Sequence, residues 1–159
     1  MATPSKRSAG ILLFRRLEGR LEVLLVHPGG PFWSKKDQGA WFMPKGELED
    51  GEEPLATARR EFREELGHEP PAGDLISLGT VENKSKKLIY AWALEGDFDL
   101  SGFKSNTFTL EWPPRSGRLS EFPEVDRAAF FSLADAALKI HVAESPLLDR
   151  LAALLETNG

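Results

Sequence analysis

The stretch over residues 46–68, GELEDGEEPLATARREFREELGH, constrains what this chain can fold into more than any other part of the sequence. It joins an acidic turn to a helix that the pattern predicts over residues 52–66. Pro54 suits the first helical turn, where a missing N–H costs nothing, and Gly67 suits a left-handed C-terminal cap. Apolar residues recur at three- and four-residue intervals, which predicts one buried face of the helix. This face consists of Leu55, Ala58, Phe62 and Leu66.

The neighbouring face of the same helix carries Glu61, Glu64 and Glu65 at positions i, i+3 and i+4. This spacing brings three carboxylates together near the C-terminal end, where they repel one another and the helix dipole is also negative. A positive group is therefore expected beside them. Two interpretations remain open. The glutamates pair with arginines such as Arg60 on a solvated face, or they bind a hard divalent cation, which prefers oxygen ligands.

The spacing of residues in this stretch resembles the signature of the Nudix hydrolase family. The matching positions are Gly46, Glu52, Arg60, Glu61, Phe62, Glu64, Glu65 and Gly67. The last position departs from the pattern, because His68 stands where an aliphatic residue is usual. The resemblance implies Mg²⁺ or Mn²⁺ as cofactor. The metal ligands that it implies are Glu61, Glu64, Glu65 and the backbone carbonyl of Lys45.

The resemblance also implies roles for the other residues of the stretch. Glu52 is expected to brace Arg60 and so to fix the helix against the turn, while Gly46 and Gly67 belong to the structural motif. One of the glutamates or a downstream acidic residue would act as general base. A solvated acidic loop explains the downstream residues equally well. The catalytic residues implied are Glu64, Glu61 and Arg60, and the downstream candidates are Glu121 and Glu124.

The reaction that the resemblance implies is in-line attack of water on a phosphoanhydride, assisted by a divalent metal. Residues 41–52 resemble Nudix hydrolases of the diadenosine-polyphosphate and diphosphoinositol type, and residues 112–127 resemble predicted bacterial NTP pyrophosphohydrolases. The expected substrate is therefore a nucleoside triphosphate or a dinucleoside polyphosphate. Three alternatives remain: a non-catalytic nucleotide-binding or sensor module, an RNA 5′-end pyrophosphohydrolase, and a purely structural interaction protein.

Composition narrows the class of protein further. The chain has 159 residues, which suits a single domain over residues 1–159. It has no cysteine, which excludes disulfides and thiolate chemistry and suits the reducing cytoplasm. The net charge of −5 gives no electrostatic footprint for nucleic acid. No apolar run approaches the ~20 residues of a membrane span. We expect a cytoplasmic protein whose partner is a small-molecule nucleotide, with neither membrane nor nucleic acid.

The remaining pattern predicts an α/β fold. Residues 8–16 and 21–27 read as two strands joined by a turn that contains Gly19, and further strands follow before and after the acidic helix. Ser145 and Pro146 begin a final helix. The order of elements predicts a mixed sheet between helical layers, and the resemblance implies a Nudix-type α/β/α sandwich. The other predicted strands cover residues 41–43, 75–81, 87–94, 106–112 and 128–131, and a short helix covers residues 132–139.

Several residues outside the acidic helix are candidates for substrate binding. The loop over residues 32–40 holds Lys35 and Lys36, and it is either a surface loop or a lid with lysines for phosphate and Trp33 for a base. Tyr90 falls on one face of its strand with Trp92, for sheet packing or for stacking on a base. Arg115 lies in a proline-rich turn, where it binds a phosphate or is an ordinary surface residue.

Overall fold

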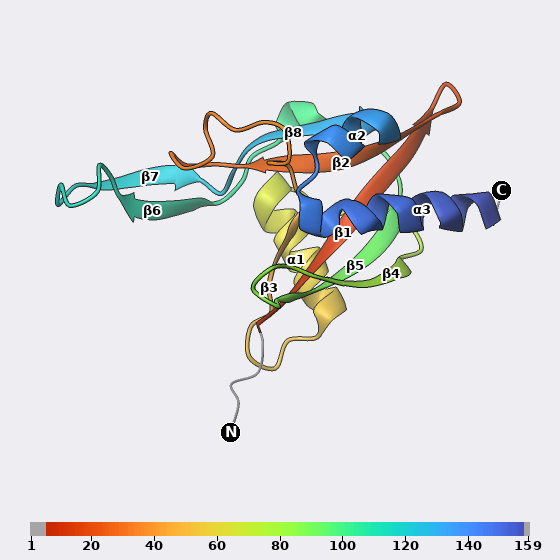
Figure 1. Cartoon of the computed structure of the whole chain (residues 1–159), viewed down its shortest axis with the longest axis horizontal. Coiled ribbons are helices and arrows are strands. Elements are labelled where there is room, and N and C mark those ends of the chain that lie inside the picture. Colours follow the sequence, from red (N-terminus) through yellow and green to blue (C-terminus); the bar gives the residue numbers. More distant parts are fainter. Residues whose placement is uncertain (1–5, 158–159) are drawn as a thin grey trace.

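A six-stranded mixed sheet forms the centre of the computed structural model, which describes residues 6–157 (Figure 1). The strand order is β4-β5-β1-β2-β8, and β3 also pairs with β1. The central strand β1 is parallel to β5 and antiparallel to β2 and β3. The predicted mixed sheet is therefore confirmed. The strands are β1 (Arg7–Leu17), β2 (Arg20–Pro28), β3 (Lys45–Glu47), β4 (Ile76–Glu82), β5 (Leu88–Glu95) and β8 (Val125–Ser132).

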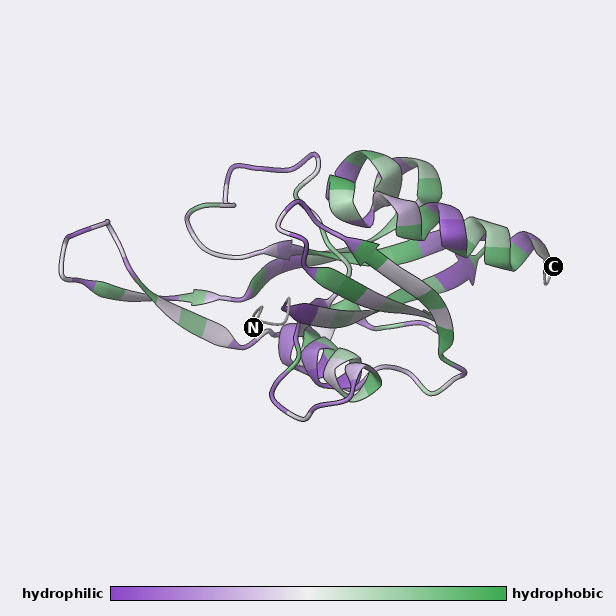
Figure 2. Ribbon diagram, turned by 60° about the horizontal axis from the view of Figure 1, so that its bottom comes forward, coloured by the Kyte–Doolittle hydropathy of each residue, from purple (hydrophilic) through white to green (hydrophobic). Residues whose placement is uncertain are grey.

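Helices cover both faces of this sheet (Figure 2). Helix α1 (Pro54–Leu66) packs on one face, and α2 (Leu133–Lys139) and α3 (Ser145–Thr157) pack on the other. Successive side chains of β1 point to opposite faces of the sheet and so contribute to the hydrophobic cores on both faces. Ile11 and Leu13 face α1, while Leu12 faces the layer of α2 and α3. The α/β/α sandwich is confirmed. Two short 3₁₀ turns, η1 (Leu100–Gly102) and η2 (Val142–Glu144), complete the helical elements.

One edge of β1 is shared by two partners. Its first residues, Ser8–Gly10 in the pairing register, face β3, and its last residues, from Phe14 onward, face β2. Between these two pairings β2 and the segment before β3 diverge from β1, and we call this region the fork. A Cβ at Gly10 would lie 2.3 Å from the Pro44 carbonyl oxygen, so only glycine allows the backbones to approach there.

The prediction of a strand over residues 41–43 is wrong. Trp41 and Phe42 form only isolated bridges, with Ile140 and Val26 respectively, and the regular strand starts at Lys45. Pro44 has no N–H for a ladder, which explains why the pairing is interrupted there. The sequence pattern missed β3 because its three residues, KGE, have no apolar alternation.

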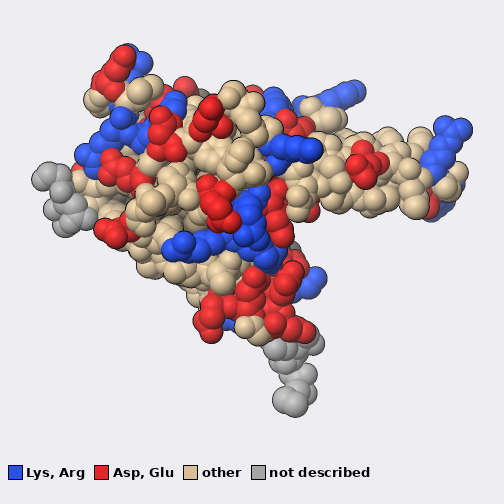
Figure 3. Space-filling view, turned by 180° about the vertical axis from the view of Figure 1, so that it is seen from behind, with Lys and Arg blue, Asp and Glu red and all other residues tan. Residues whose placement is uncertain are grey.

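A two-stranded arm extends from the body of the molecule (Figure 1). It consists of β6 (Thr107–Glu111) and β7 (Leu119–Pro123), which pair only with each other. The first of these strands was predicted, whereas the second was expected to be part of an acidic loop, which is a correction. Phe108 and Phe122 face each other across the arm with ring centroids 5.9 Å apart, a contact that stabilises a hairpin. Seen from behind, the arm has few charged side chains outside its tip (Figure 3).

None of the described helices is long and apolar enough to cross a membrane.

Candidate active site

Arg60 organises the acidic turn and the helix that follows it. Its Nε donates to Glu52 Oε2 at 2.8 Å, and its Nη2 donates to Glu52 Oε1 at 2.9 Å. Glu52 Oε1 also accepts the Glu49 backbone N–H at 3.1 Å, which ties the turn to the same carboxylate. This is the bracing contact expected from the sequence. The Arg60 guanidinium is the main cause that lowers the pKa of Glu52 to about 2.

The lowered pKa of Glu52 predicts how stability depends on pH. Because this pKa falls from 4.5 to about 2 on folding, the Glu52–Arg60 contact stabilises the fold fully above pH 4.5. The contribution is lost as the pH falls through about 2. We therefore expect Glu52→Gln to be less stable than wild type by a constant amount at neutral pH, with a gap that narrows below pH 4.5. Urea unfolding at several pH values measures this gap, and a gap independent of pH would contradict the assignment.

Two glycines allow close contacts that no other residue permits. A Cβ at Gly46 would lie 2.0 Å from Glu61 Cδ, so the carboxylate of Glu61 packs directly on the glycine backbone. Gly67 ends α1 with a φ of 85°, and a Cβ there would lie 2.6 Å from the Lys104 carbonyl oxygen. The helix end is capped by the following loop, because Asn106 N donates to the Glu64 carbonyl at 2.8 Å.

The three glutamates of α1 differ in their surroundings. Arg60 Nη1 donates to Glu61 Oε1 at 2.9 Å and to Glu64 Oε2 at 3.1 Å. Glu65 is buried, and its Oε2 has no hydrogen-bond partner among the described residues. Burial raises the pKa of Glu65 well above its usual range and, with help from the Glu64 charge, raises the pKa of Glu61. The cluster is thus only partly neutralised by Arg60.

The structure brings Glu124 to this cluster and leaves Glu121 outside it. Glu124 lies between β7 and β8, where its backbone carbonyl accepts the Gly29 N–H at 3.0 Å. Its side chain lines the same pocket as Glu65, and burial together with the Glu64 charge raises the pKa of Glu124. Glu121 lies exposed on the arm strand β7, paired with Thr109. Of the two downstream candidates, only Glu124 is in position to act with α1.

The donor set fits a hard divalent cation in its chemistry. Carboxylate oxygens predominate, and the partnerless Oε2 of Glu65 is a buried acceptor that needs a positive or donor group. As they stand, no three Asp, Glu or His side chains within residues 6–157 are arranged to hold an ion. Arg60 accounts for this in part, because it engages both Glu61 and Glu64.

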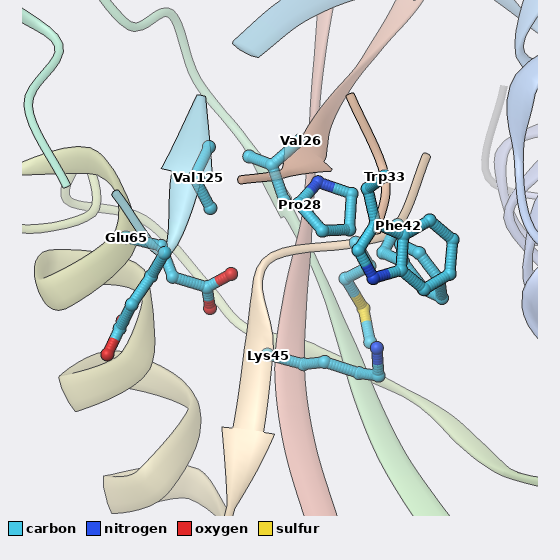
Figure 4. A pocket seen from close by; sticks show the side chains of 9 residues that line it. Val26, Pro28, Trp33, Phe42, Lys45, Glu65 and Val125 are labelled. Atoms are coloured by element: carbon cyan, nitrogen blue, oxygen red, sulfur yellow. The ribbon is translucent and has the colours of Figure 1, made fainter. Parts of the chain in front are cut away.

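A pocket of about 170 Å³ opens beside the carboxylates. Figure 4 shows Trp33 and Phe42 on one side of it and Glu65 on the other, with Lys45 directed toward Phe42. The rings of Trp33 and Phe42 meet edge to face with centroids 5.5 Å apart. The pocket therefore joins an apolar, aromatic wall to an acidic one, as many small-molecule sites do. It is lined by Val26, Pro28, Trp33, Phe42, Met43, Lys45, Glu65, Glu124 and Val125.

The other predicted substrate contacts lie at different distances from this pocket. Lys36 is held near the wall, with its Nζ 5.1 Å from the centre of the Trp33 ring, and Lys35 is exposed on the same loop. Tyr90 packs against the α1-side core and does not line the pocket. Arg115 lies between the two strands of the arm, at its outer end. The loop is thus the only one of these elements that contributes to the pocket lining, through Trp33.

Two buried polar groups beside the pocket were not singled out from the sequence. Glu144 accepts the Met43 N–H at 2.8 Å through Oε1, and its Oε2 forms an ion pair with Lys45 Nζ at 2.8 Å, outside hydrogen-bond geometry. His27 is fully buried and contacts Asp126. A histidine within an otherwise apolar strand was the one signal in the sequence for this contact.

The fold and the site together define a class of proteins in which an α/β/α sandwich presents a glycine-supported acidic helix beside a small-molecule pocket. The chain belongs to the NUDIX domain family, whose model matches residues 4–151. This confirms the family that the acidic stretch resembles.

Individual relatives show what this chain is similar to. An RNA pyrophosphohydrolase from Bartonella henselae is 35% identical over 68 residues, which cover 40% of this chain and 36% of that protein. The chain thus matches little more than a third of that relative's length. A binary complex of the C. elegans Ap4A hydrolase superimposes with a TM-score of 0.67 at 22% identity, over 94% of this chain and 98% of that one. The NUDIX domain of Shewanella oneidensis NrtR complexed with ADP ribose superimposes with a TM-score of 0.66 at 18% identity. The match covers 97% of this chain and 90% of that one. The two structures support the fold.

Proposed function

We propose that this chain is a Nudix pyrophosphohydrolase that cleaves a phosphoanhydride bond in a nucleoside triphosphate or a dinucleoside polyphosphate. The observation that carries the proposal is that Glu65 and Glu124 line a pocket whose other wall is aromatic, while Glu61 and Glu64 lie on the same helix as Glu65. A relative named as an RNA pyrophosphohydrolase and a similar structure named as an Ap4A hydrolase support this reaction class.

Different residues of the chain have different proposed roles in this reaction. Glu61, Glu64, Glu65 and the Lys45 carbonyl would hold Mg²⁺ or Mn²⁺, with Glu124 as a further ligand or the base. Such an ion, when bound, neutralises phosphate charge and eases deprotonation of water. Arg60 keeps Glu61 and Glu64 in place, and Glu52 fixes Arg60. A carboxylate with a raised pKa, as in Glu124, suits a group that accepts a proton from water near neutral pH.

The aromatic wall supports a nucleotide as the substrate class. A nucleobase has a flat apolar face, and Trp33 and Phe42 offer ring surfaces at the end of the pocket away from the glutamates. Lys36 beside Trp33 adds a positive charge for a phosphate. The family of similar structures includes one with ADP ribose bound, which agrees with a nucleotide site.

A nucleotide sensor on the same fold and an RNA 5′-end pyrophosphohydrolase are the competing functions. The second is favoured by the name of the Bartonella relative. Acidic and basic side chains are interspersed on the face shown in Figure 3, where no continuous basic stripe is visible. This gives a nucleic-acid backbone little to bind on that face, so we rank the small-molecule substrate first.

A turnover screen in H₂¹⁸O tests the proposal. Purified protein is incubated with nucleoside triphosphates, dinucleoside polyphosphates, ADP ribose and triphosphorylated RNA, each with Mg²⁺ or Mn²⁺. We expect metal-dependent cleavage of a free nucleotide, with the label in the product phosphate that water attacked. Binding of nucleotide without turnover would select the sensor, and cleavage of the RNA alone would select the RNA enzyme.

A further inference from the structure

His27 makes two short hydrogen bonds in the interior, one from each nitrogen of its ring. Nδ1 lies 2.7 Å from Asp126 Oδ1 and Nε2 lies 2.7 Å from the Lys36 carbonyl oxygen. A carbonyl oxygen only accepts, so Nε2 is the donor in the second contact. The side chain is 0% exposed, and its ring meets Trp41 edge to face at 5.3 Å. The histidine is therefore a fully used polar group that none of the proposed chemical steps requires.

The two partners of His27 belong to different walls of the pocket. Asp126 follows Val125 and Glu124, which both line the pocket from β8 and the residue before it. The Lys36 carbonyl ends a tight turn that begins at Trp33, because Lys36 N donates to the Trp33 carbonyl at 2.9 Å. His27 itself lies between Val26 and Pro28, which line the pocket from β2. One buried ring thus joins the three segments that surround the aromatic end.

Several side chains of this loop also contact their surroundings. The Phe32 ring meets Trp112 and the Trp33 ring meets Phe42, with centroids 5.4 and 5.5 Å apart, and Asp37 accepts the Trp41 Nε1–H at 2.8 Å. Trp33 N donates to the Gly30 carbonyl at a long 3.4 Å within the loop, and Phe32 is 59% exposed. The ends of the loop are fixed by backbone contacts, from Gly29 to the Glu124 carbonyl and from Gly39 to the Leu138 carbonyl. Among the hydrogen bonds of the described residues, the one from His27 Nε2 connects the backbone of the Trp33 turn directly to a strand of the sheet.

We propose that His27 and Asp126 are positioning residues that hold the Trp33 turn against the pocket and thereby determine nucleotide affinity. The inference rests on the proposed function in one respect, namely that a nucleotide occupies the pocket beside Trp33. The pair acts through the loop, whereas Glu61, Glu64 and Glu65 belong to α1 on the opposite wall. Glu124 lies two residues before Asp126, and its backbone is held separately by the Gly29 N–H. Loss of the pair should therefore weaken binding of the nucleotide without slowing the chemical step.

The main variant is His27→Phe, which keeps a ring against Trp41 and removes both hydrogen bonds. We expect faster amide hydrogen exchange in residues 30–38, a KM for the nucleotide raised about tenfold, and a kcat within about twofold of wild type. Asp126→Ala should act in the same direction. Asp126→Asn should resemble wild type, because an amide can still pair with the ring nitrogen.

Arg150→Met is the matched control. Arg150 donates to the Leu78 and Thr80 carbonyls at 3.0 and 2.7 Å, so its loss removes two comparable hydrogen bonds far from the pocket lining. Exchange in residues 30–38 and KM should not change in this variant. If His27→Phe does not fold, the comparison of Asp126→Ala with Asp126→Asn replaces it.

The outcomes separate this inference from the proposed function. If amide hydrogen exchange in residues 30–38 is unchanged in Asp126→Ala, the pair does not hold the loop, and this result is independent of the enzyme's activity. A loosened loop with kcat reduced and KM unchanged overturns the role in affinity. If wild type binds but does not hydrolyse nucleotides, the proposed function fails, and the dissociation constant replaces KM in the same comparison. If wild type binds no nucleotide at all, the inference fails together with the proposed function.

Discussion

Replacing Glu64 with glutamine is expected to reduce turnover by more than about a hundredfold while the fold stays intact. Glu64 is one of the proposed metal ligands, and glutamine keeps its shape but removes its charge. Its side chain is 29% exposed and its hydrogen bond to Arg60 is retained in part by the amide oxygen, so little stability should be lost. Steady-state kinetics with the substrate identified by the screen measures the loss, and circular dichroism checks the fold.

Glu69→Gln is the control for Glu64→Gln. Glu69 follows α1, is exposed, and pairs only with Arg63 at the surface among the described contacts. Its replacement should leave turnover unchanged. Mn²⁺ binding without substrate adds an independent readout, and we expect weaker binding in Glu64→Gln than in wild type. Full turnover in Glu64→Gln would argue for the reading of α1 as an ordinary charged helix.

Replacing Gly46 with alanine is expected to reduce turnover by about a hundredfold and to lower the free energy of unfolding by about 1–3 kcal/mol. The new Cβ would stand 2.0 Å from Glu61 Cδ, and both oxygens of that carboxylate would be 2.3 Å away. Because Glu61 is packed between Gly46 and Arg60, the carboxylate has to leave its position. A displacement of about 1 Å in a catalytic group is enough for a loss of this size.

Gly102→Ala separates this effect from a general intolerance of added methyl groups. The nearest atom to a Cβ at Gly102 is His68 Nε2 at 3.2 Å, the end of a side chain that can move. Turnover in that variant should stay near wild type. If Gly46→Ala kept most of its turnover, the position of Glu61 would not matter to the reaction, and its proposed role would have to be withdrawn.

Local signals made the β1–β2 hairpin and helix α1 predictable. The hairpin of β1 and β2 was expected from two apolar runs around Gly19, and the turn has positive φ at both Glu18 and Gly19. Helix α1 begins at Pro54 and ends before Gly67, as its capping residues indicate, two residues later than the pattern alone suggested at its start. These elements depend on neighbours in the sequence, which the pattern contains.

The missed elements depend on partners far away in the sequence. Strand β3 exists because β1 offers it an edge. The buried contacts of His27 with Asp126 and of Met43 with Glu144 join residues 99 and 101 positions apart. The local pattern of apolar and polar residues does not predict such long-range contacts. The position of Glu124 at the site likewise follows from where the arm returns to the sheet, which the acidic loop sequence alone does not show.

The fork in β1 separates two parts of the molecule that can change independently. On one branch, β3 carries Lys45 and Gly46 toward α1, and every residue there is constrained by the carboxylates. On the other branch, β2 leads into a loop that returns to pair with the sheet at Phe42. Under the proposed function, exchanging residues 30–38 for a loop of another length should alter which nucleotides bind, while the Gly29 contact to Glu124 and the carboxylates of α1 are kept. Because the fork separates this loop from β3, loop grafting is a way to test whether the substrate preference can be changed.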